Sequence, residues 1–356
     1  MDDRVLAIIA ILLGVLIGVV LLVPFVALSY RRRGGLTVGR AALWFAGLVY
    51  FCAIWTYTLL PLPLPDPDTI RCAGVNLDIF AFIDDIRGAV RPTGVAFSDP
   101  ALLQLLLNVV LFVPLGFFVR VLGGRGIVAA GLIGFGVSAF IETTQLTGVW
   151  GLYPCAYRVF DVDDLLTNTV GALIGSVVGL VVPKSRRGVT RLPDADLPRP
   201  VTRRRRLLGM LCDLIGATMA SWATAVIVQS ALYALGAHEE VADGTAAAVV
   251  GEVTAIVIWF LVIMTTGRSV GDLAVLLRFE GTTYPVWLAR VLRFAGGIGG
   301  YLILVALPGA WGLVGGIFAV LSLALMLTTD DRRGLPGIVS GQKLVDARVR
   351  ELLQYG

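Results

Sequence analysis

The chain alternates between long apolar stretches and short polar connections. A helix needs about 20 apolar residues to cross a bilayer, and several of these stretches approach that length. We divide the longest run, 294–327, at Pro308-Gly309, because proline and glycine interrupt helices. The pattern predicts an all-α, polytopic helical membrane protein of about nine transmembrane helices, at 5–29, 41–60, 101–122, 127–147, 163–182, 207–235, 247–265, 294–307 and 311–327.

Composition supports this class. Hydrophobic residues make up 57% of the chain, charged residues 15%, and the mean hydropathy is +0.86. These values lie outside the range of soluble domains. The first apolar run is too long for a cleaved signal peptide, follows Asp2-Asp3-Arg4 and precedes Arg31-Arg32-Arg33. We therefore expect a first span with its N-terminus outside.

Lysine and arginine in the connections predict the orientation, because basic loops stay in the cytoplasm. The expected cytoplasmic segments are 30–40, 120–125, 184–206, 267–293 and the C-terminus. The segments 61–100, 148–161 and 236–246 then lie outside. The basic segment 184–206 would also attract anionic lipids of the inner leaflet, whereas no nucleic-acid-binding module is visible.

The same pattern divides the chain into two membrane domains. Residues 1–183 hold five spans, and residues 206–345 hold about four. Between them, 184–205 reads as a basic, proline-containing cytoplasmic linker. Residues 346–356 read as a C-terminal tail, with 343–354 either a surface amphipathic helix or part of a solvated tail.

One face of the fifth span carries the small and polar residues. At about 100° per residue, this face holds Asp161, Asp164, Asn168, Gly171, Gly175 and Gly179. Glycines four residues apart allow close approach of another helix. The three glycines therefore predict a helix-packing surface, with the polar residues directed at the same partner.

Polar residues of three consecutive spans fall at similar depth, roughly 8–10 Å below the outer surface. Together with residues at the end of the preceding outer loop they predict an outward-facing, ligand-binding polar pocket, formed by Asn108, Glu142, Gln145, Arg158, Asp161, Asp164 and Asn168. Arg158 is the expected counter-charge for Glu142 or the aspartates. Ionisable groups inside spans are costly and need a partner or a function.

Two interpretations of this cluster stay open: a ligand site, or a hydrogen-bond network that locks the helices together. Catalysis by paired carboxylates is a weaker alternative, because the only histidine, His238, lies in another loop. The Asp161, Asp163 and Asp164 group fits helix capping better than a divalent cation. We therefore expect no metal and no cofactor.

Several motifs of the first half resemble the VanZ-like family, over roughly residues 40–182. The motifs are NVVLFVPLGF at 108–117, IETTQ at 141–145, RVFDVDDLLTNTVGA at 158–172 and the outer-loop Asn-x-x-x-Phe element at 76–80. The resemblance implies a multi-pass protein of the bacterial plasma membrane and cell envelope. The family takes its name from a member linked to resistance to the glycopeptide antibiotic teicoplanin.

The second half resembles the RDD family. Arg206 and Asp213 are seven residues apart at the start of a span, and 267–272 resembles the cytoplasmic turn of that family. The resemblance implies a role that has been tied to transport. We expect Asp213 to form a structural charge pair with Arg206, on the same helix face, or with an arginine of 267–293.

These features favour a non-enzymatic envelope protein. It would bind a lipid-linked cell-wall precursor or a glycopeptide at the outer leaflet and change sensitivity to teicoplanin-type antibiotics. The alternatives are a small-solute or ion transporter using the RDD-like half, and a membrane enzyme acting on lipid-linked precursors. Its oligomeric state does not follow from the sequence.

Two of the four cysteines, Cys72 and Cys155, fall in predicted outer loops. The outer face is oxidising, so a disulfide between them is expected if their Cα atoms come within ~7 Å. The alternative is a pair of free thiols. A bridge would hold the 61–100 loop over Glu142.

Overall fold

A computed structural model describes residues 3–60, 62, 72–79, 90, 91, 94, 95 and 100–349. This part of the chain is almost entirely helical, which confirms the predicted fold class. Among the described residues, eight helices are long and apolar enough to cross a membrane. The number rises to nine if a helix pair bent by 49°, Val286–Ala295 and Ile298–Ala306, counts as one span.

The chain forms two compact units. The first comprises Met1–Gly18 and Thr37–Thr190, and the second comprises Val19–Leu36 and Arg191–Gly356. The division differs from the predicted one, because the helix α1 (Asp3–Arg33) contributes residues to both units. The predicted linker is also divided, since its residues from Arg191 onward belong to the second unit, where Arg205 is buried.

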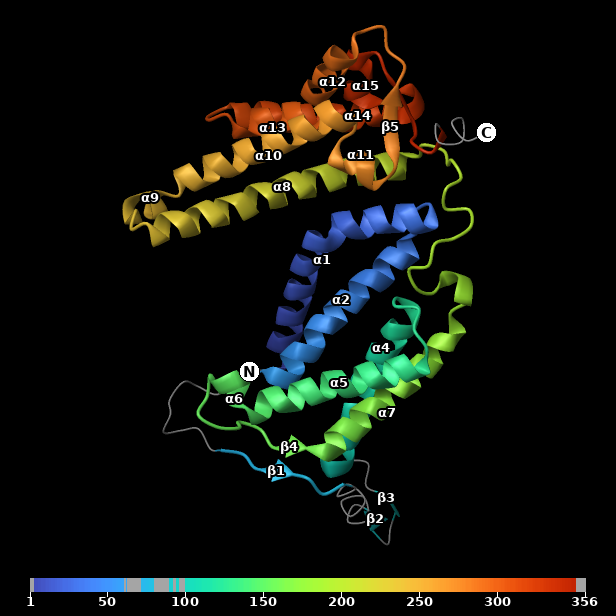
Figure 1. Ribbon diagram of the computed structural model, residues 1–356, viewed down its shortest axis with the longest axis vertical. Helices are drawn as coiled ribbons and strands as arrows, with labels where there is room; N and C mark the ends of the chain where they lie inside the picture. The colour runs from blue at the N-terminus through green and yellow to red at the C-terminus, as the bar shows by residue number, and fades with distance from the viewer. Residues whose placement is uncertain are drawn as a thin grey trace. The chain divides into compact units, whose positions relative to one another are not determined.

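The first unit is a helical bundle in which α4, α5 and α7 pack side by side (Figure 1). Ile54, Phe112 and Ile141 form its buried apolar cluster. Besides the first part of α1, its elements are α2 (Val38–Leu59), β1 (Val75–Asn76), β2 (Val90–Arg91), β3 (Gly94–Val95), α4 (Pro100–Val121), α5 (Ile127–Leu146), α6 (Gly148–Gly151), β4 (Phe160–Asp161), α7 (Val162–Val178) and 3₁₀ turns at Gly179–Val181 and Lys184–Arg186.

In the second unit, α8 and α10 run side by side and are joined through the short α9 (Figure 1). One core cluster gathers Cys212, Val275 and Leu277 with residues of α1, and another gathers Trp259 and Phe294. The elements are α8 (Arg203–Ala234), α9 (His238–Asp243), α10 (Thr245–Thr266), α11 (Val270–Ala274), β5 (Leu277–Glu280), α12 (Val286–Ala295), α13 (Ile298–Ala306), α14 (Trp311–Thr328), a 3₁₀ turn at Asp330–Arg332, α15 (Gly334–Ser340) and β6 (Lys343–Asp346).

Side-chain caps fix where several helices begin. The hydroxyl of Thr37 accepts a hydrogen bond from Arg40 N at the start of α2, and Thr202 does the same for Arg205 N at the start of α8. Ser269 and Asp272 form a reciprocal capping box at α11. Such caps satisfy backbone N–H groups that have no partner inside the helix.

The predicted break at Pro308-Gly309 is present, since α13 ends at Ala306 and α14 begins at Trp311. The helical region before it begins at Val286 rather than near residue 294. An amphipathic segment, α12, therefore precedes the apolar α13.

The predicted C-terminal tail is wrong for its first residues. Strand β6 pairs antiparallel with β5, from Leu277 opposite Asp346 to Glu280 opposite Lys343. Residues 343–346 are therefore neither an amphipathic helix nor a solvated tail, because a distant strand supplies their backbone partners. Residues 350–356, like 61, 63–71, 80–89, 92, 93 and 96–99 of the outer loop, lie outside the described residues.

Candidate polar site of the first unit

The glycine face of α7 sets the spacing of the bundle. A Cβ atom built on Gly171 or Gly175 would collide with the backbone carbonyl of Val109 or Val113 on α4. One on Gly179 would lie 3.0 Å from the side chain of Arg120. The three predicted packing glycines thus all face α4, and the two helices approach to backbone contact.

This close approach joins polar side chains of α4 and α7. Asn108 Nδ2 donates a hydrogen bond to Asp164 Oδ1 at 2.5 Å. Both side chains are partly exposed, whereas Asn168, one turn further along α7, is buried. The pair therefore lies at the edge of the bundle, where a carboxylate oxygen remains available as an acceptor.

A second contact joins α5 to the start of α7. Glu142 is 3% exposed, and its Oε2 accepts a hydrogen bond from the backbone N–H of Asp161 at 3.2 Å. Asp161 in turn caps α7 by accepting from Asp163 N at 2.9 Å, and its other oxygen accepts from Asn76 Nδ2 at 3.2 Å. The aspartate thus acts as the predicted helix cap and also holds the outer-loop Asn-x-x-x-Phe element, of which residue 80 is outside the described part.

The deeper end of the cluster is a serine–asparagine contact. Asn168 Nδ2 donates to Ser138 Oγ at 2.9 Å, and Ser138 Oγ donates to the carbonyl of Asp164 at 3.4 Å. Within the described residues, Asn168 Oδ1 is buried without a hydrogen-bond partner. An unpartnered buried acceptor is uncommon and marks a place for a water molecule or a ligand donor.

Two of the predicted site residues contact α2 instead. Gln145 Nε2 and Arg158 Nη1 both donate to the carbonyl oxygen of Thr58, at 2.7 and 3.1 Å. Within the part of the chain that the structure describes, no ion pair joins Arg158 to Glu142 or to the aspartates. Arg158 is exposed beside the cluster, and its hydrogen bond goes to a backbone carbonyl at the end of α2. It therefore acts as the predicted counter-charge for Glu142 and Asp164 only at a distance, through electrostatic attraction and without a direct ion pair.

Tyr157 also contacts the end of α2, through a hydrogen bond from its hydroxyl to the carbonyl of Leu59 at 3.3 Å. Burial raises the pKa of Tyr157, and the nearby Arg158 opposes this only in part. The phenol therefore stays protonated at neutral pH and remains a donor. The carbonyls of Thr58 and Leu59 are the contact points that sequence reasoning missed, because a backbone oxygen has no signal in the sequence.

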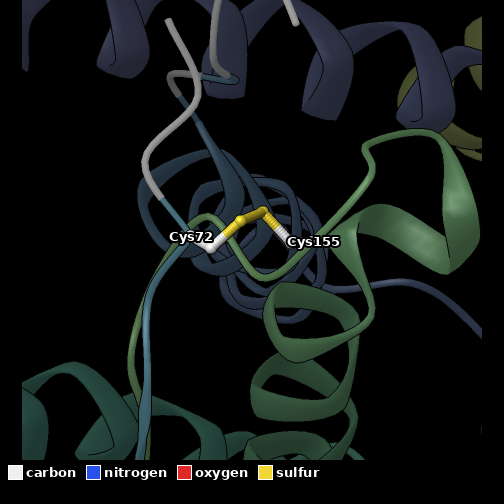
Figure 2. Close-up of a disulfide and its surroundings, with 2 residues drawn as sticks. All are labelled: Cys72 and Cys155. Atoms are coloured by element: carbon white, nitrogen blue, oxygen red, sulfur yellow. A yellow bond between two sulfur atoms is a disulfide. The ribbon is translucent and has the colours of Figure 1, made fainter. Parts of the chain in front are cut away.

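A disulfide ties the outer loop to the segment before α7. Cys72 and Cys155 are bonded, with their Cα atoms 5.5 Å apart (Figure 2). Just beyond it, β1 pairs in parallel with β4, Val75 opposite Phe160 and Asn76 opposite Asp161. The disulfide is the one considered from the sequence, and the strand pairing beside it holds Asn76 against the start of α7.

The arrangement brings together Asn108, Ser138, Glu142, Asp161, Asp164 and Asn168, with Gln145 and Arg158 beside them. Its side chains present mainly carboxylate and amide oxygens, so it can accept hydrogen bonds from amines, amides and hydroxyls. In the described residues, no three His, Cys, Asp or Glu side chains are grouped so as to hold a metal ion.

The charged residues of the second unit form different pairs from those expected. Arg206 Nη1 contacts Asp272 Oδ1 at 2.7 Å, and the side chains of both are buried. Asp213 accepts hydrogen bonds from Trp259 Nε1, Ser269 Oγ and Gly271 N, at 2.8, 2.6 and 2.7 Å. The predicted Arg206–Asp213 pair is thus corrected: α11 supplies a second aspartate for Arg206, and α10, the cap of α11 and α11 itself each supply a neutral donor to Asp213.

These observations define a helical membrane protein whose first unit carries a polar cluster tied to a disulfide-bonded outer loop. Residues 45–182 match the VanZ/LLP1 family, so this part of the chain is VanZ-like, as the motifs predicted. No curated protein and no solved structure matches the chain. The RDD-like character of the second half stays a prediction.

Proposed function

We propose that the first unit binds a cell-wall ligand at the outer leaflet and thereby lowers sensitivity to teicoplanin-type glycopeptides. The ligand is either a lipid-linked wall precursor or the glycopeptide itself. The observation that carries the proposal is that Asn108 and Glu142 contact Asp164 and Asp161 at the start of α7, at the end that the charge rule assigns to the outside.

The chemistry of the cluster narrows the ligand groups. Glu142, Asp161 and Asp164 are acids, and the backbone N–H of Asp161 already occupies one oxygen of Glu142. An acidic, acceptor-rich surface favours amines, amides and sugar hydroxyls and disfavours a bare phosphate. The peptide and sugar portions of a precursor or a glycopeptide fit this requirement, with Arg158 available at the rim for an anionic group.

A complementation experiment tests the proposal. In a strain lacking the protein, the wild type should restore teicoplanin tolerance, and Glu142→Gln should not, although its amide oxygen still accepts from Asp161 N. Asp164→Asn serves as the second variant, and Gln104→Ala, at an exposed position on α4, is the matched control. Membrane levels are measured for every variant.

Binding of purified protein to immobilised teicoplanin and to a precursor peptide then separates the two ligands. Loss of one charged acceptor should weaken binding about tenfold. If both variants reach the membrane normally and match the wild type in tolerance and binding, the cluster is only a packing network and the proposal fails.

A further inference from the structure

The second unit contains a basic cavity of about 650 Å³ at the end of α10. Strand β5, the start of α12 and the turn after α10 form its walls, and these elements lie close together in Figure 1. Of the described residues that line it, four are arginines and one is an acid: Arg268, Arg278, Arg290, Arg293 and Glu280. The cavity has the size of a ligand site.

The positive charge of this cavity is only partly compensated by acids. Arg278 pairs with Glu280, but Arg290 Nη1 donates to the backbone carbonyls of Met264 and Thr265. A carbonyl satisfies a hydrogen bond without cancelling the charge of a guanidinium. An anion in the cavity would therefore gain electrostatic attraction from its walls.

Arg293 gives an independent indication of a missing partner. Its side chain is 3% exposed and lies over the ring of Phe279, 5.0 Å from the ring centroid. Its Nη2 is buried with no hydrogen-bond partner among the described residues. A buried, unpartnered guanidinium donor is costly, because it has lost its water without gaining an acceptor.

The surface beside the cavity has features typical of a membrane interface. The first residues of α12 include Trp287, which is 61% exposed, next to the exposed Val286. Other residues of α12, namely Ala289, Arg293 and Phe294, are buried. An amphipathic helix with an exposed tryptophan is typical of the region where lipid headgroups lie.

We propose that this cavity binds a phosphoryl group of net negative charge, held by Arg293 and by the arginines around it. Planar guanidinium groups match phosphate oxygens in geometry as well as in charge. The group can belong to an anionic phospholipid headgroup or to a free phosphorylated molecule. This site is in the second unit and does not depend on the function proposed for the first.

Two measurements on the purified full-length protein separate these sources. Native mass spectrometry after reconstitution in phosphatidylglycerol or in phosphatidylcholine measures retained lipid. Thermal unfolding in inorganic phosphate or in chloride, at equal ionic strength, measures binding of the free anion. Retention of phosphatidylglycerol without a phosphate effect assigns the headgroup, whereas stabilisation by phosphate assigns a free phosphorylated ligand.

Variants connect the binding to the cavity. Arg293→Gln and Arg278→Gln should each weaken it about tenfold, the cost of one charge-assisted contact. Arg203→Gln removes the same charge at an exposed position outside the cavity and should leave binding unchanged. If Arg293→Gln does not fold, Arg278→Gln decides. The proposal is overturned if the wild type shows no preference in either measurement, or if Arg278→Gln binds like Arg203→Gln.

Discussion

At the scale of single residues, Asp346 has hydrogen-bond donors on both oxygens of its carboxylate. Its Oδ2 accepts from Arg205 Nη1 at 2.8 Å and from Arg348 Nη2 at 2.6 Å, and the backbone N–H of Arg199 adds a bond of 2.9 Å. Arg348 Nη1 continues to the carbonyl of Ala195 at 2.7 Å. The carboxylate thus joins the segment before α8 to the C-terminal strand.

The same contacts shift the ionisation of Asp346. Burial alone would raise the pKa of this carboxyl, but the hydrogen bonds from Arg348, Arg205 and Arg199 outweigh it and hold the pKa well below its usual range. A carboxyl whose pKa is lowered on folding stabilises the folded state above its unfolded pKa, near 3.9. This contribution declines as the pH falls further, toward the folded pKa.

We predict that Asp346→Asn lowers the thermal midpoint of the purified protein by roughly 5 °C or more between pH 5 and 8. The reason is that two buried guanidinium groups lose their counter-charge. Below about pH 4 the difference from the wild type should shrink. Asp196→Asn is the matched control, since Asp196 pairs with Arg191 at 2.5 Å but is 60% exposed, and an exposed pair contributes little. Two results would contradict a stabilising role of Asp346 as counter-charge to these arginines. One is an equal effect of the two substitutions, and the other is a difference from the wild type that does not change with pH.

Residue-level prediction succeeded where a helix fixed the geometry. Asn108, Glu142 and Asp164 could be brought together because their depths in three neighbouring helices follow from residue counts. Arg158 and Asp346 could not be placed, because Arg158 contacts a carbonyl at the end of α2 and Asp346 depends on the side chain of Arg205, 141 positions away. A pattern along the chain carries no information about such partners.

At the scale of elements, the contact between α4 and α7 organises the first unit. A Cβ on Gly175 would overlap Val113 O, and one on Gly116 of α4 would overlap Ala172 O of α7. The two helices therefore present glycine to each other from both sides. Such contact between backbones is how helices associate where lipid removes the hydrophobic driving force.

Gly175→Ala should destabilise the protein by about 1–3 kcal/mol, because the helices must separate to admit the methyl group. Loss of the contact should also weaken the Asn108–Asp164 hydrogen bond, which depends on the same approach. The measurement is the thermal midpoint in detergent. Gly136→Ala is the control, because a Cβ at Gly136 of α5 meets nothing within 4 Å. Gly136→Ala should leave stability unchanged or raise it, since alanine favours a helix. A Gly175→Ala protein as stable as the Gly136→Ala protein would refute the packing role of Gly175.

The helices themselves followed from apolar periodicity, and most predicted bounds agree with the observed helices to within a few residues. The elements that the sequence did not predict are short. Strands β5 and β6 are four residues each, and α12 is an amphipathic helix whose charged face hides it from a search for apolar runs. Long-range pairing, rather than local propensity, makes the strands form.

At the scale of the whole molecule, the two units each have their own buried clusters, and α1 contributes residues to both. Val26 and Tyr30 belong to the core of the second unit, whereas a Cβ on Gly14 would collide with Val49 of the first. The family match begins after α1, at residue 45. The first span is thus shared structurally, so that residues 206–345 alone would lack Val26 and Tyr30 of the second core.

The number of crossings depends on the bent pair α12–α13. If it crosses once, nine spans place the N-terminus outside and the C-terminus in the cytoplasm, as the basic connections predict. If it enters and leaves on one side, eight spans put the C-terminus outside, against the charge rule. The arginine-lined cavity would stay on the same side in either case, because the end of α10 and β5, which line it, precede the bent pair. The pairing of β5 with β6 favours a C-terminus on that same side, as nine spans require.

A reporter active only in the cytoplasm distinguishes these topologies. Fused after Gly356 of the full chain it should be active, as it should be when inserted after the exposed Asp196, whereas insertion after Gly236 should silence it. Silence at Gly356 with the other two results unchanged would show that α12–α13 does not cross. Activity at Gly236 and silence at Asp196 would show that the orientation of the whole chain is the reverse of the predicted one. The polar cluster of the first unit would then lie at the cytoplasmic face, where no extracellular glycopeptide reaches it.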